Sequence, residues 1–481
     1  PESLFQKTAE IADEPTLLTR RQILRGSGVL CAAAMAPPAL FAMDDSSSLD
    51  RRPAKSKRHF VSPAIESAIV DIRKRIADPQ LAAIFENCLP NTLDTTVFPS
   101  TLNGKPDTFV VTGDIDAMWL RDSSAQVMPY LPFAKKDPAL SRLLEGVIRR
   151  QAHLILLDPY ANAFMRSTAD APLSWSLHDK TDMHRLAHAY WRATGSSAAF
   201  DATWKEAAWA IVRTFREQQR KASRGPYHFQ RAAESPTDTL MLSGYGNPIR
   251  PNGMICSMFR PSDDACIYPF FVPANLFAVA SLRQLAEIAS KALSDAKLAT
   301  ECDSLAAEVA AAVARYGTVE HPVHGKIYAY EIDGYGNHVC MDDANAPSLM
   351  SLPFLGACPV SDPLYQRTRG FVLSRDNPYF FEGKAAEGVG GPHIGLGYIW
   401  PMSILLRAFT SNNDAEIRRC LYTLRNTTAE TFFMHEAFQQ DNPRDFTRSW
   451  FAWANTLFGE LILKLAAEKP SLLAHDFSIQ A

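Results

Sequence analysis

Apolar residues recur at three- and four-residue intervals along most of the chain, the repeat of an α-helix with one buried face. The pattern is clear from Leu140 to Ile148, from Leu276 to Ile288 and from Cys302 to Val313. Further amphipathic helices are expected over residues 64–76, 79–87, 200–221, 415–427 and 450–469. Strand-like alternation is confined to short stretches such as residues 326–332. The sequence therefore predicts a mostly helical body.

Long segments rich in Gly, Pro, Asp and aromatic residues separate these helices. These segments are too long, and contain too many residues capable of binding or catalysis, to be simple connections. No second Ser/Gly linker and no internal repeat divides residues 59–481. Helices paired antiparallel, with loops meeting at one end, would bury the apolar faces against one another. We therefore expect one all-α domain over residues 59–481, with the number of helix pairs left open.

Composition removes several classes of protein. A chain of 481 residues with 47% hydrophobic and 21% charged residues is neither disordered nor a small disulfide-stapled scaffold. A formal charge of -3 gives no broad attraction to nucleic acid or to an anionic membrane. Of the eight cysteines, Cys31 falls in the first 42 residues, and the remaining seven are an odd number with no CxxC pair, so no disulfide framework is assigned. An aromatic content of 10% suits a neutral partner with flat apolar faces, such as a sugar.

The first 42 residues are interpreted as a targeting segment. Arg20 and Arg21 precede an Ala-rich apolar run over residues 28–42, the layout of a twin-arginine signal. The run is too short and too weakly apolar for a membrane span, and an ordinary N-terminal helix is the alternative. Residues 43–58 are polar and are interpreted as a linker. We therefore expect a periplasmic or secreted bacterial protein whose precursor engages the twin-arginine export machinery.

The first motif that could carry chemistry spans residues 112–131. It contains Asp114, Asp116, Trp119, Arg121 and Asp122. Carboxylates accept hydrogen bonds from adjacent hydroxyls, a guanidinium donates as a fork, and an indole covers the C–H face of a ring. The motif could therefore hold a polyol. The alternative is a helix N-terminus with Asp caps and a buried ion pair.

A second motif places Asp263 and Asp264 side by side, after a proline turn and before an apolar run. One of two adjacent carboxylates at the edge of a core can be desolvated, as a general acid requires. Capping of the following helix by Ser262 and Asp263 is the alternative.

Metal ligands are not expected. Asp342, Asp343 and Asn345 have an Asp-x-Asn spacing, but the later glycine and glutamate of a calcium loop are missing. His184 and His188 share a helix face without the glutamate of a zinc-binding HExxH motif, so they are interpreted as ordinary helix-surface histidines. No cofactor motif is present either, so neither a metal nor a cofactor is expected.

Two later segments add candidates. The glycine-rich residues 390–401 predict close backbone approach to a ligand, with His393 as a neutral hydrogen-bonding group. Glu436 directly follows an apolar run, which favours either catalysis or a tightly paired structural carboxylate. No GxSxG, Cys/His or dinucleotide motif occurs, so carboxylates are left as the reacting groups. Paired carboxylates with aromatic residues point to glycoside hydrolysis.

Taken in chain order, these motifs resemble glycoside hydrolase family 125. They are TGDIDAMWLRDSSAQV, FRPSDDA, MDDANAPSL, PHIGLGYIWP and the stretch from MHEAF to TRSWFAWANTLFGEL. The resemblance extends from about Phe60 to about Ala467. It implies an (α/α)6 toroid and a metal-independent, inverting exo-α-1,6-mannosidase acting on terminal mannose of mannans or glycans.

The resemblance also implies roles for individual residues. The general acid falls in the RPSDD segment and corresponds to Asp263, with Asp264 as the alternative, and the general base corresponds to Glu436. By position, the walls of the terminal-sugar site would be Asp116, Trp119, Arg121, Asp122, Asp264, His393, His435 and Arg448.

One segment departs from the family pattern. Family members usually read Trp-Glu-apolar-Asp-Ser where this chain reads Trp175-Ser176-Leu177-His178-Asp179. An (α/α)6 inverting glycosidase with a different sugar or linkage preference is therefore an alternative. A non-catalytic carbohydrate-binding protein is a second alternative, which retention of both Asp263 and Glu436 disfavours.

Overall fold

The computed structural model describes residues 49–478, apart from residues 162, 167–171, 174–178 and 234. The expected targeting segment, residues 1–42, and the Trp175 to His178 departure lie outside the described residues. Within them, the chain is mostly helical, as the periodicity predicts. The helices are α2 (Pro63–Arg73), α3 (Pro79–Cys88), α4 (Asn91–Thr95), α5 (Leu120–Val127), α6 (Pro138–Leu157), α7 (Asp179–Thr194), α8 (Ala202–Gln218), α9 (Met241–Gly244), α10 (Val272–Lys291), α11 (Ala296–Tyr316), α12 (Pro363–Val372), α13 (Pro401–Phe409), α14 (Asp414–Asn426) and α15 (Ala452–Glu468).

Helix starts follow from local chemistry. Asp78 and Asp137 each accept a hydrogen bond from the backbone N–H three residues on, and each is followed by a proline at the first helical position. A carboxylate at the N-cap satisfies a free backbone donor, while proline supplies the required φ at no cost in hydrogen bonds. These two caps start α3 and α6 at the residues where the apolar repeat begins.

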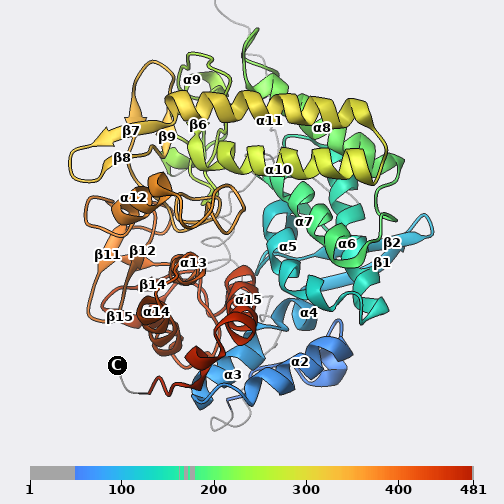
Figure 1. Ribbon diagram of the computed structural model, residues 1–481, viewed down its shortest axis with the longest axis vertical. Helices are drawn as coiled ribbons and strands as arrows, with labels where there is room; N and C mark the ends of the chain where they lie inside the picture. Colours follow the sequence, from blue (N-terminus) through green and yellow to red (C-terminus); the bar gives the residue numbers. More distant parts are fainter. Residues whose placement is uncertain (1–48, 162, 167–171, 174–178, 234, 479–481) are drawn as a thin grey trace, which may run out of the picture.

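The helices pack in pairs around a common centre (Figure 1). Helix α10 packs along α11, α6 contacts both α7 and α8, and α13 packs between α14 and α15. Helix α15 closes the ring because it contacts both α3, near the start of the described chain, and α5. The apolar faces of these helices form one continuous core.

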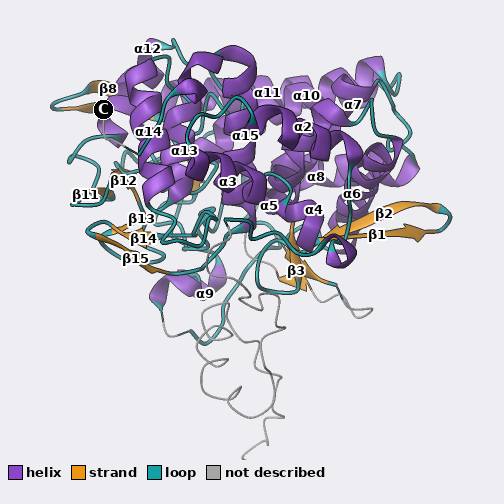
Figure 2. Ribbon diagram, turned by 90° about the horizontal axis from the view of Figure 1, so that it is seen from below, coloured by secondary structure: helices purple, strands orange, loops and turns teal. Residues whose placement is uncertain are grey.

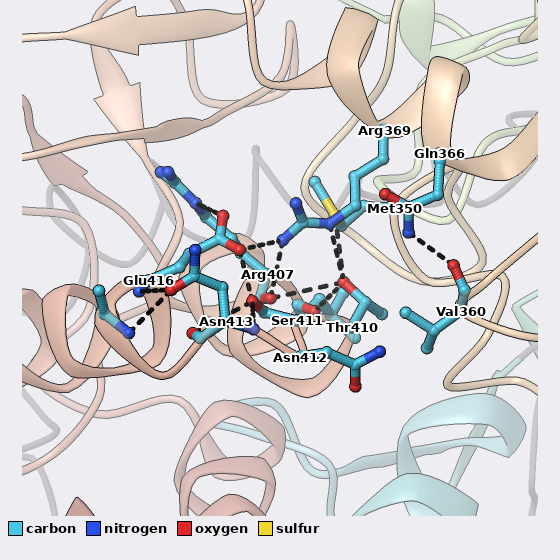
Figure 3. Close-up of polar contacts among 12 residues, drawn as sticks. Met350, Val360, Gln366, Arg369, Arg407, Thr410, Ser411, Asn412, Asn413 and Glu416 are labelled. Carbon is cyan, nitrogen blue, oxygen red and sulfur yellow. Dashed lines mark hydrogen bonds and ion pairs between the residues drawn. The ribbon is translucent and has the colours of Figure 1, made fainter. Parts of the chain in front are cut away.

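An ion-pair cluster joins three of the later helices (Figure 3). Glu416 of α14 accepts hydrogen bonds from Arg369 of α12 at 3.0 Å and from Arg407 of α13 at 2.8 Å. Ser411 donates a further hydrogen bond to Glu416. Burial alone would raise the pKa of Glu416, but the hydrogen bonds from Ser411 and Arg407 lower it. The cluster therefore ties α12, α13 and α14 to one another.

The strands are short and lie in the connections between helices. They are β1 (Val97–Leu102), β2 (Lys105–Val110), β3 (Ala117–Trp119), β4 (Ala163–Met165), β5 (Pro172–Leu173), β6 (Phe270–Phe271), β7 (Thr318–His321), β8 (Gly325–Tyr328), β9 (Glu331–Ile332), β10 (His338–Val339), β11 (Phe380–Glu382), β12 (Glu387–Val389), β13 (Tyr398–Ile399), β14 (Phe438–Gln439) and β15 (Asn442–Phe446). All the strand pairs described are antiparallel. Strands β3 and β13 to β15 lie at one end of the helical layer, together with α9 (Figure 2). This end carries the loops that contain the sequence motifs.

The polar segment before the first helix differs from the expected linker over its described part. Arg52 is buried, and its guanidinium pairs with Asp94 at 2.8 Å and with Glu66. The Asn87 side chain donates to the backbone carbonyl of Leu49 at 3.0 Å. Residues 49–58 thus order themselves on the helical body through charge pairing, although they bury little apolar surface.

Two further expectations, on membrane spans and on disulfides, can be compared with the described residues. None of the helices described combines the length and the apolar character needed to cross a bilayer. Every described cysteine is a free thiol, and most of these thiols are buried.

Candidate active site

Asp263 lies at the tip of a tight hairpin formed by residues 259–265. Phe259 and Ala265 form its bridge, and the Arg260 N–H donates to the Asp264 carbonyl at 2.7 Å. Asp263 adopts a left-handed conformation with φ of +74° and is 9% exposed. Aspartate tolerates this region better than most residues, which explains an Asp at the turn. Helix α10 begins only at Val272 with no side-chain cap, so the capping alternative for Asp263 is wrong.

Two other motifs hold this hairpin through the carbonyl of Pro261. Arg121 Nη1 donates to it at 2.8 Å, and Asn345 Nδ2 donates to it at 3.2 Å. The neighbouring Ser262 hydroxyl donates to Asp343 Oδ2 at 2.5 Å. The first, second and third motifs of the sequence therefore meet at the acidic hairpin.

A buried ion pair supports the hairpin from below. Arg260 Nε lies 2.6 Å from Glu331 Oε1, and both side chains are almost fully enclosed. The other oxygen of Glu331 accepts from the backbone N–H groups of Ile267 and Tyr268 at 2.9 and 3.0 Å. Glu331 lies in β9, which pairs with β6 ahead of α10. This carboxylate fixes both limbs of the hairpin, and no motif in the sequence pointed to it.

The carboxylates around Asp263 are poorly compensated. Asp264 Oδ2 lies 3.8 Å from His393 Nδ1 and has no hydrogen-bond partner among the described residues. Burial raises the pKa of Asp264, although the nearby His393 and Arg260 oppose the shift. Burial also raises the pKa of Asp343 to about 6, against the hydrogen bond from Ser262. This part of the site therefore favours neutral carboxylic acids.

Glu436 is 3% exposed and lies directly before β14. Its Oε2 accepts from Arg448 Nε at 3.0 Å and from the Thr447 hydroxyl at 3.2 Å. Arg448 also forms an ion pair with Asp114 of the first motif. Because strands β14 and β15 form a hairpin, Arg448 returns beside Glu436 after a short excursion of the chain. The fifth motif therefore supplies both the carboxylate and the cation that orients it.

His435 supports this arrangement rather than facing it. Its Nδ1–H donates to the Arg448 carbonyl at 2.7 Å, and its ring stacks on Phe446 with centroids 4.0 Å apart. Burial lowers the pKa of His435, so the ring is neutral near neutral pH. His435, which was predicted to contact the sugar, therefore supports the Glu436 hairpin in this structure.

Arg121 connects the two halves of the site. Besides its bond to Pro261, it pairs with Asp122 at 2.7 Å and lies over the Trp453 ring, 5.1 Å from its centroid. Trp453 belongs to α15, just beyond Arg448. The expected buried ion pair of the first motif is therefore present, and it is part of the site rather than an alternative to it.

The remaining predicted wall residues divide into two groups. Trp119 is buried at the end of β3, where its backbone N–H donates to the Thr112 hydroxyl, and it lies two residues before Arg121 of α5. Asp116, by contrast, is half exposed and pairs at 2.9 Å with Arg166, which is also exposed and directly follows β4. The structure therefore places Asp116 at the rim, away from the contacts that join the other motifs.

The glycine-rich loop makes the close backbone approach that its sequence predicts, but to protein atoms. A Cβ on Gly390 would lie 2.0 Å from the Tyr398 carbonyl, so only glycine fits. A Cβ on Gly391 would lie 3.1 Å from Asp343 Oδ1. The loop can therefore press against the acidic cluster and place His393 beside Asp264.

The groups considered for metal binding have other partners. Asp342 accepts from the N–H groups of Leu349 and Met350 at 2.8 and 2.9 Å, and Asp343 accepts from Asn345. His184 is fully buried instead of lying on a helix surface, and burial lowers its pKa to about 3. His188 pairs with Glu287 at 2.8 Å.

Comparison with known proteins agrees with this arrangement. The family model described as metal-independent alpha-mannosidase (GH125) matches residues 78–463. The chain is 40% identical over 461 residues to the Meiotically up-regulated gene 157 protein of Schizosaccharomyces pombe, covering 89% of this chain and 90% of that protein. A Streptococcus pneumoniae protein, solved as a non-productive complex with α-1,6-mannobiose, superimposes with a TM-score of 0.80 at 35% identity. That match covers 85% of this chain and 100% of the other, which is described as one of a family of metal-independent alpha mannosidases.

The family match includes all five motifs that meet around Asp263 and Glu436, and the structural match covers most of the chain. The architecture is the expected (α/α)6 toroid. The chain belongs to the GH125 family of metal-independent α-mannosidases.

Proposed function

We propose that this protein is an inverting exo-α-1,6-mannosidase that releases terminal mannose from mannans or glycans. The observation that carries the proposal is the pair of enclosed carboxylates, Asp263 and Glu436, on two hairpins joined through Arg121 and Trp453. The α-1,6 linkage is suggested by the mannobiose bound to the Streptococcus pneumoniae relative.

In this mechanism, Asp263 protonates the oxygen of the glycosidic bond while Glu436 removes a proton from the attacking water. The bond between the anomeric carbon and that oxygen breaks as the bond to water forms, so the configuration inverts in one displacement. Arg448 and Thr447 orient the Glu436 carboxylate toward water. Arg121 and Asn345 hold the Asp263 turn through Pro261.

The test is the configuration of the first product. The enzyme is mixed with α-1,6-mannobiose, and the anomeric protons are followed by NMR before mutarotation equilibrates them. Inversion predicts that β-mannose appears first from the non-reducing end. Early α-mannose would contradict the single displacement, and absence of turnover with turnover of another glycoside would favour the alternative specificity.

The segment Trp175 to Asp179 is the reason to test other sugars alongside mannose, because it departs from the usual family pattern. Turnover of any glycoside would remove the alternative of a non-catalytic carbohydrate-binding protein. That alternative has little support, because binding alone does not require both enclosed carboxylates.

We also propose export by the twin-arginine route, on the strength of Arg20 and Arg21 ahead of the Ala-rich run. Replacing both arginines by lysine should retain the precursor in the cytoplasm of a bacterial host. Unchanged periplasmic activity of that variant would contradict the proposal.

A further inference from the structure

A hollow lies next to the residues that flank the acidic hairpin, Met258 and Ile267. It encloses about 400 Å³ and is lined by two segments, residues 220–224 and 242–251. Helix α9, which borders it, is at the same end of the molecule as β3 and β13 to β15 (Figure 2). This hollow, called the outer pocket below, therefore opens on the end that carries the catalytic loops.

The outer pocket is fixed to the hairpin that carries Asp263. Asn247 Nδ2 donates to the carbonyl of Ile267 at 2.8 Å. Arg220 donates to the Tyr245 carbonyl at 2.9 Å and lies 3.3 Å from Met258 Sδ, on the other limb. Ile267 follows Asp263 by four residues, a length of chain that spans at most about 14 Å. The outer pocket is therefore within the reach of a few sugar rings from Asp263.

The loop that forms one wall has an unusual backbone. Leu242 and Ser243 are consecutive non-glycine residues with φ of +53° and +59°, and Gly244 and Gly246 also have positive φ. The Phe229 N–H holds the turn by donating to the Gly244 carbonyl at 3.0 Å. Backbone conformations of this kind persist only where the surrounding structure imposes them, and they cluster at ligand sites.

The lining has the chemistry that a hydroxyl-rich ligand requires. The Arg224 guanidinium lies over the Tyr245 ring at 5.4 Å from its centroid, and Ser223 and Asn247 add neutral polar groups. Pro248 and Ile249 supply apolar surface. A planar donor fork, an aromatic ring and small polar groups around an apolar patch are suited to a pyranose, which has both hydroxyls and a C–H face.

We propose that the outer pocket is a distal subsite for the sugars of the leaving group. The inference rests on the proposed function, because the acid protonates the oxygen that joins the terminal mannose to the next sugar. The remainder of the glycan must therefore leave on the Asp263 side, where this pocket lies. Its occupant would be a neutral oligosaccharide, two or more residues beyond the bond that is cleaved.

The experiment compares two substrates and two variants. Linear α-1,6-mannotetraose extends into the outer pocket, whereas an activated aryl α-mannoside has no sugar on that side. For Arg224→Ala, the ratio of kcat/KM on the tetraose to kcat/KM on the aryl mannoside should fall about tenfold, since one hydrogen bond from a charged donor is lost. Arg418→Ala, at a half-buried arginine of α14, removes the same charge far from the hairpin and should leave the ratio unchanged.

Two further tests do not rely on the Arg224→Ala turnover ratio alone. One measures binding directly, and the other fills the outer pocket with a larger side chain. In a Glu436→Gln background, calorimetry should show about tenfold weaker binding of the tetraose when Arg224→Ala is added. Ser223→Trp should act in the same direction by occupying the pocket. An unchanged ratio and unchanged tetraose affinity in both variants, with normal turnover of the aryl mannoside, would overturn the subsite alone. Absence of turnover of both substrates by the wild-type enzyme would overturn the proposed function and, with it, the subsite.

Discussion

The two hairpins of the site enclose their carboxylates in opposite ways. On the Asp263 hairpin, Arg260 is paired with Glu331, and the neighbouring Asp343 accepts a hydrogen bond from the neutral Ser262 hydroxyl. Arg231 lies close enough to Asp263 for the two charges to interact. On the Glu436 hairpin, the cation is directed at the carboxylate itself, because Arg448 lies 3.0 Å from it. Burial raises the pKa of the two acids beside Asp263, which are Asp264 and Asp343, whereas an arginine directly compensates the charge of Glu436.

This difference gives the catalytic roles a physical basis. An inverting glycosidase needs one carboxyl group that holds a proton and one that can accept a proton from water. Surroundings that treat two carboxylates differently are the usual means of separating an acid from a base. The asymmetry therefore supports Asp263 as the acid and Glu436 as the base, and each prediction below tests it.

The largest effect is expected from the pair itself. Asp263→Asn should lose far more activity on α-1,6-mannobiose than on an activated aryl mannoside, because a good leaving group needs no proton. Glu436→Gln should lose both activities about equally, since water must be activated in either case. Each loss should reach the order of 10² to 10⁴ fold in kcat/KM.

Asp264→Asn is the matched control for the acid, since it is the neighbouring carboxylate in the same turn. A nearly normal Asp263→Asn enzyme beside an inactive Asp264→Asn enzyme would transfer the acid role to Asp264. Equal losses on the two substrates for every variant would remove the distinction between the hairpins.

The free energy of unfolding should depend on pH because of the buried carboxylate of Asp343. The folded protein raises the pKa of Asp343 from 3.8 to about 6 by burial, so the fold favours the protonated form. Stability from this group is therefore present at low pH and is lost as pH rises from about 4 to about 6, by about 3 kcal/mol. Relative to wild type, Asp343→Asn should gain stability over that window.

Denaturant unfolding at a series of pH values measures this effect. Asp303→Asn, an exposed aspartate on α11, serves as the control and should show no such window. A difference between Asp343→Asn and wild type that stays constant from pH 4 to pH 7 would contradict a destabilising buried carboxylate at this position.

On the Glu436 hairpin, we expect Arg448 to affect catalysis by orienting the Glu436 carboxylate. Arg448→Gln should lower kcat on the order of 10² fold, the scale expected when a catalytic group is misplaced, with little change in KM. Arg448→Lys should recover part of the loss, because it keeps the charge but not the planar geometry.

Arg166→Gln is the matched control, since Arg166 also pairs with an aspartate of the first motif, Asp116, but at the outer rim. It should leave kcat near the wild-type value. A loss as large as that of Arg448→Gln would restore Asp116 to the sugar site and would show that distance from Glu436 does not matter.

The sequence predicted the parts of this molecule that depend on local order. Every expected helix has a counterpart in the structure. A 3.6-residue apolar repeat and an N-cap both depend only on residues that are close together in the sequence. The five motifs were found for a similar reason, since each concentrates carboxylates, glycines and aromatic residues. Strands of two or three residues carry no readable period, so most of the small sheets could not be predicted.

The contacts that give the two hairpins their different character could not be predicted from the sequence. Arg260 and Glu331 are 71 residues apart, and Arg448 and Asp114 are 334 apart, so no local pattern pairs them. Residues 49–58 were misjudged for the same reason, because Arg52 meets Asp94 only after folding. The placement of Asp116 at the rim likewise depends on Arg166, which follows β4 and lies 50 residues further along the chain.

The smallest expected effect is that of metal removal. Asp342 and Asp343, the carboxylates considered for calcium, accept hydrogen bonds from backbone N–H groups and from Ser262. Among the described residues, His321, His324 and Asp376 come close enough together to bind an ion. However, His321 Nδ1 accepts from the N–H groups of Val323 and His324, so the proton of the neutral ring is on Nε2. His324 Nε2 pairs with Asp376 Oδ2 at 2.8 Å, so each of the three groups already has a partner within the protein.

Exhaustive treatment with EDTA should therefore leave both kcat and the melting temperature unchanged. A loss of activity restored by calcium would make Asp342 and Asp343 ligands, and would replace the acidic hairpin's hydrogen-bonded carboxylates by metal-bound ones. A fall in melting temperature restored by zinc, with no change in kcat, would instead place an ion at the β7–β8 turn. The calcium result would break the contrast between the two hairpins, because a divalent cation would then lie beside the acidic hairpin.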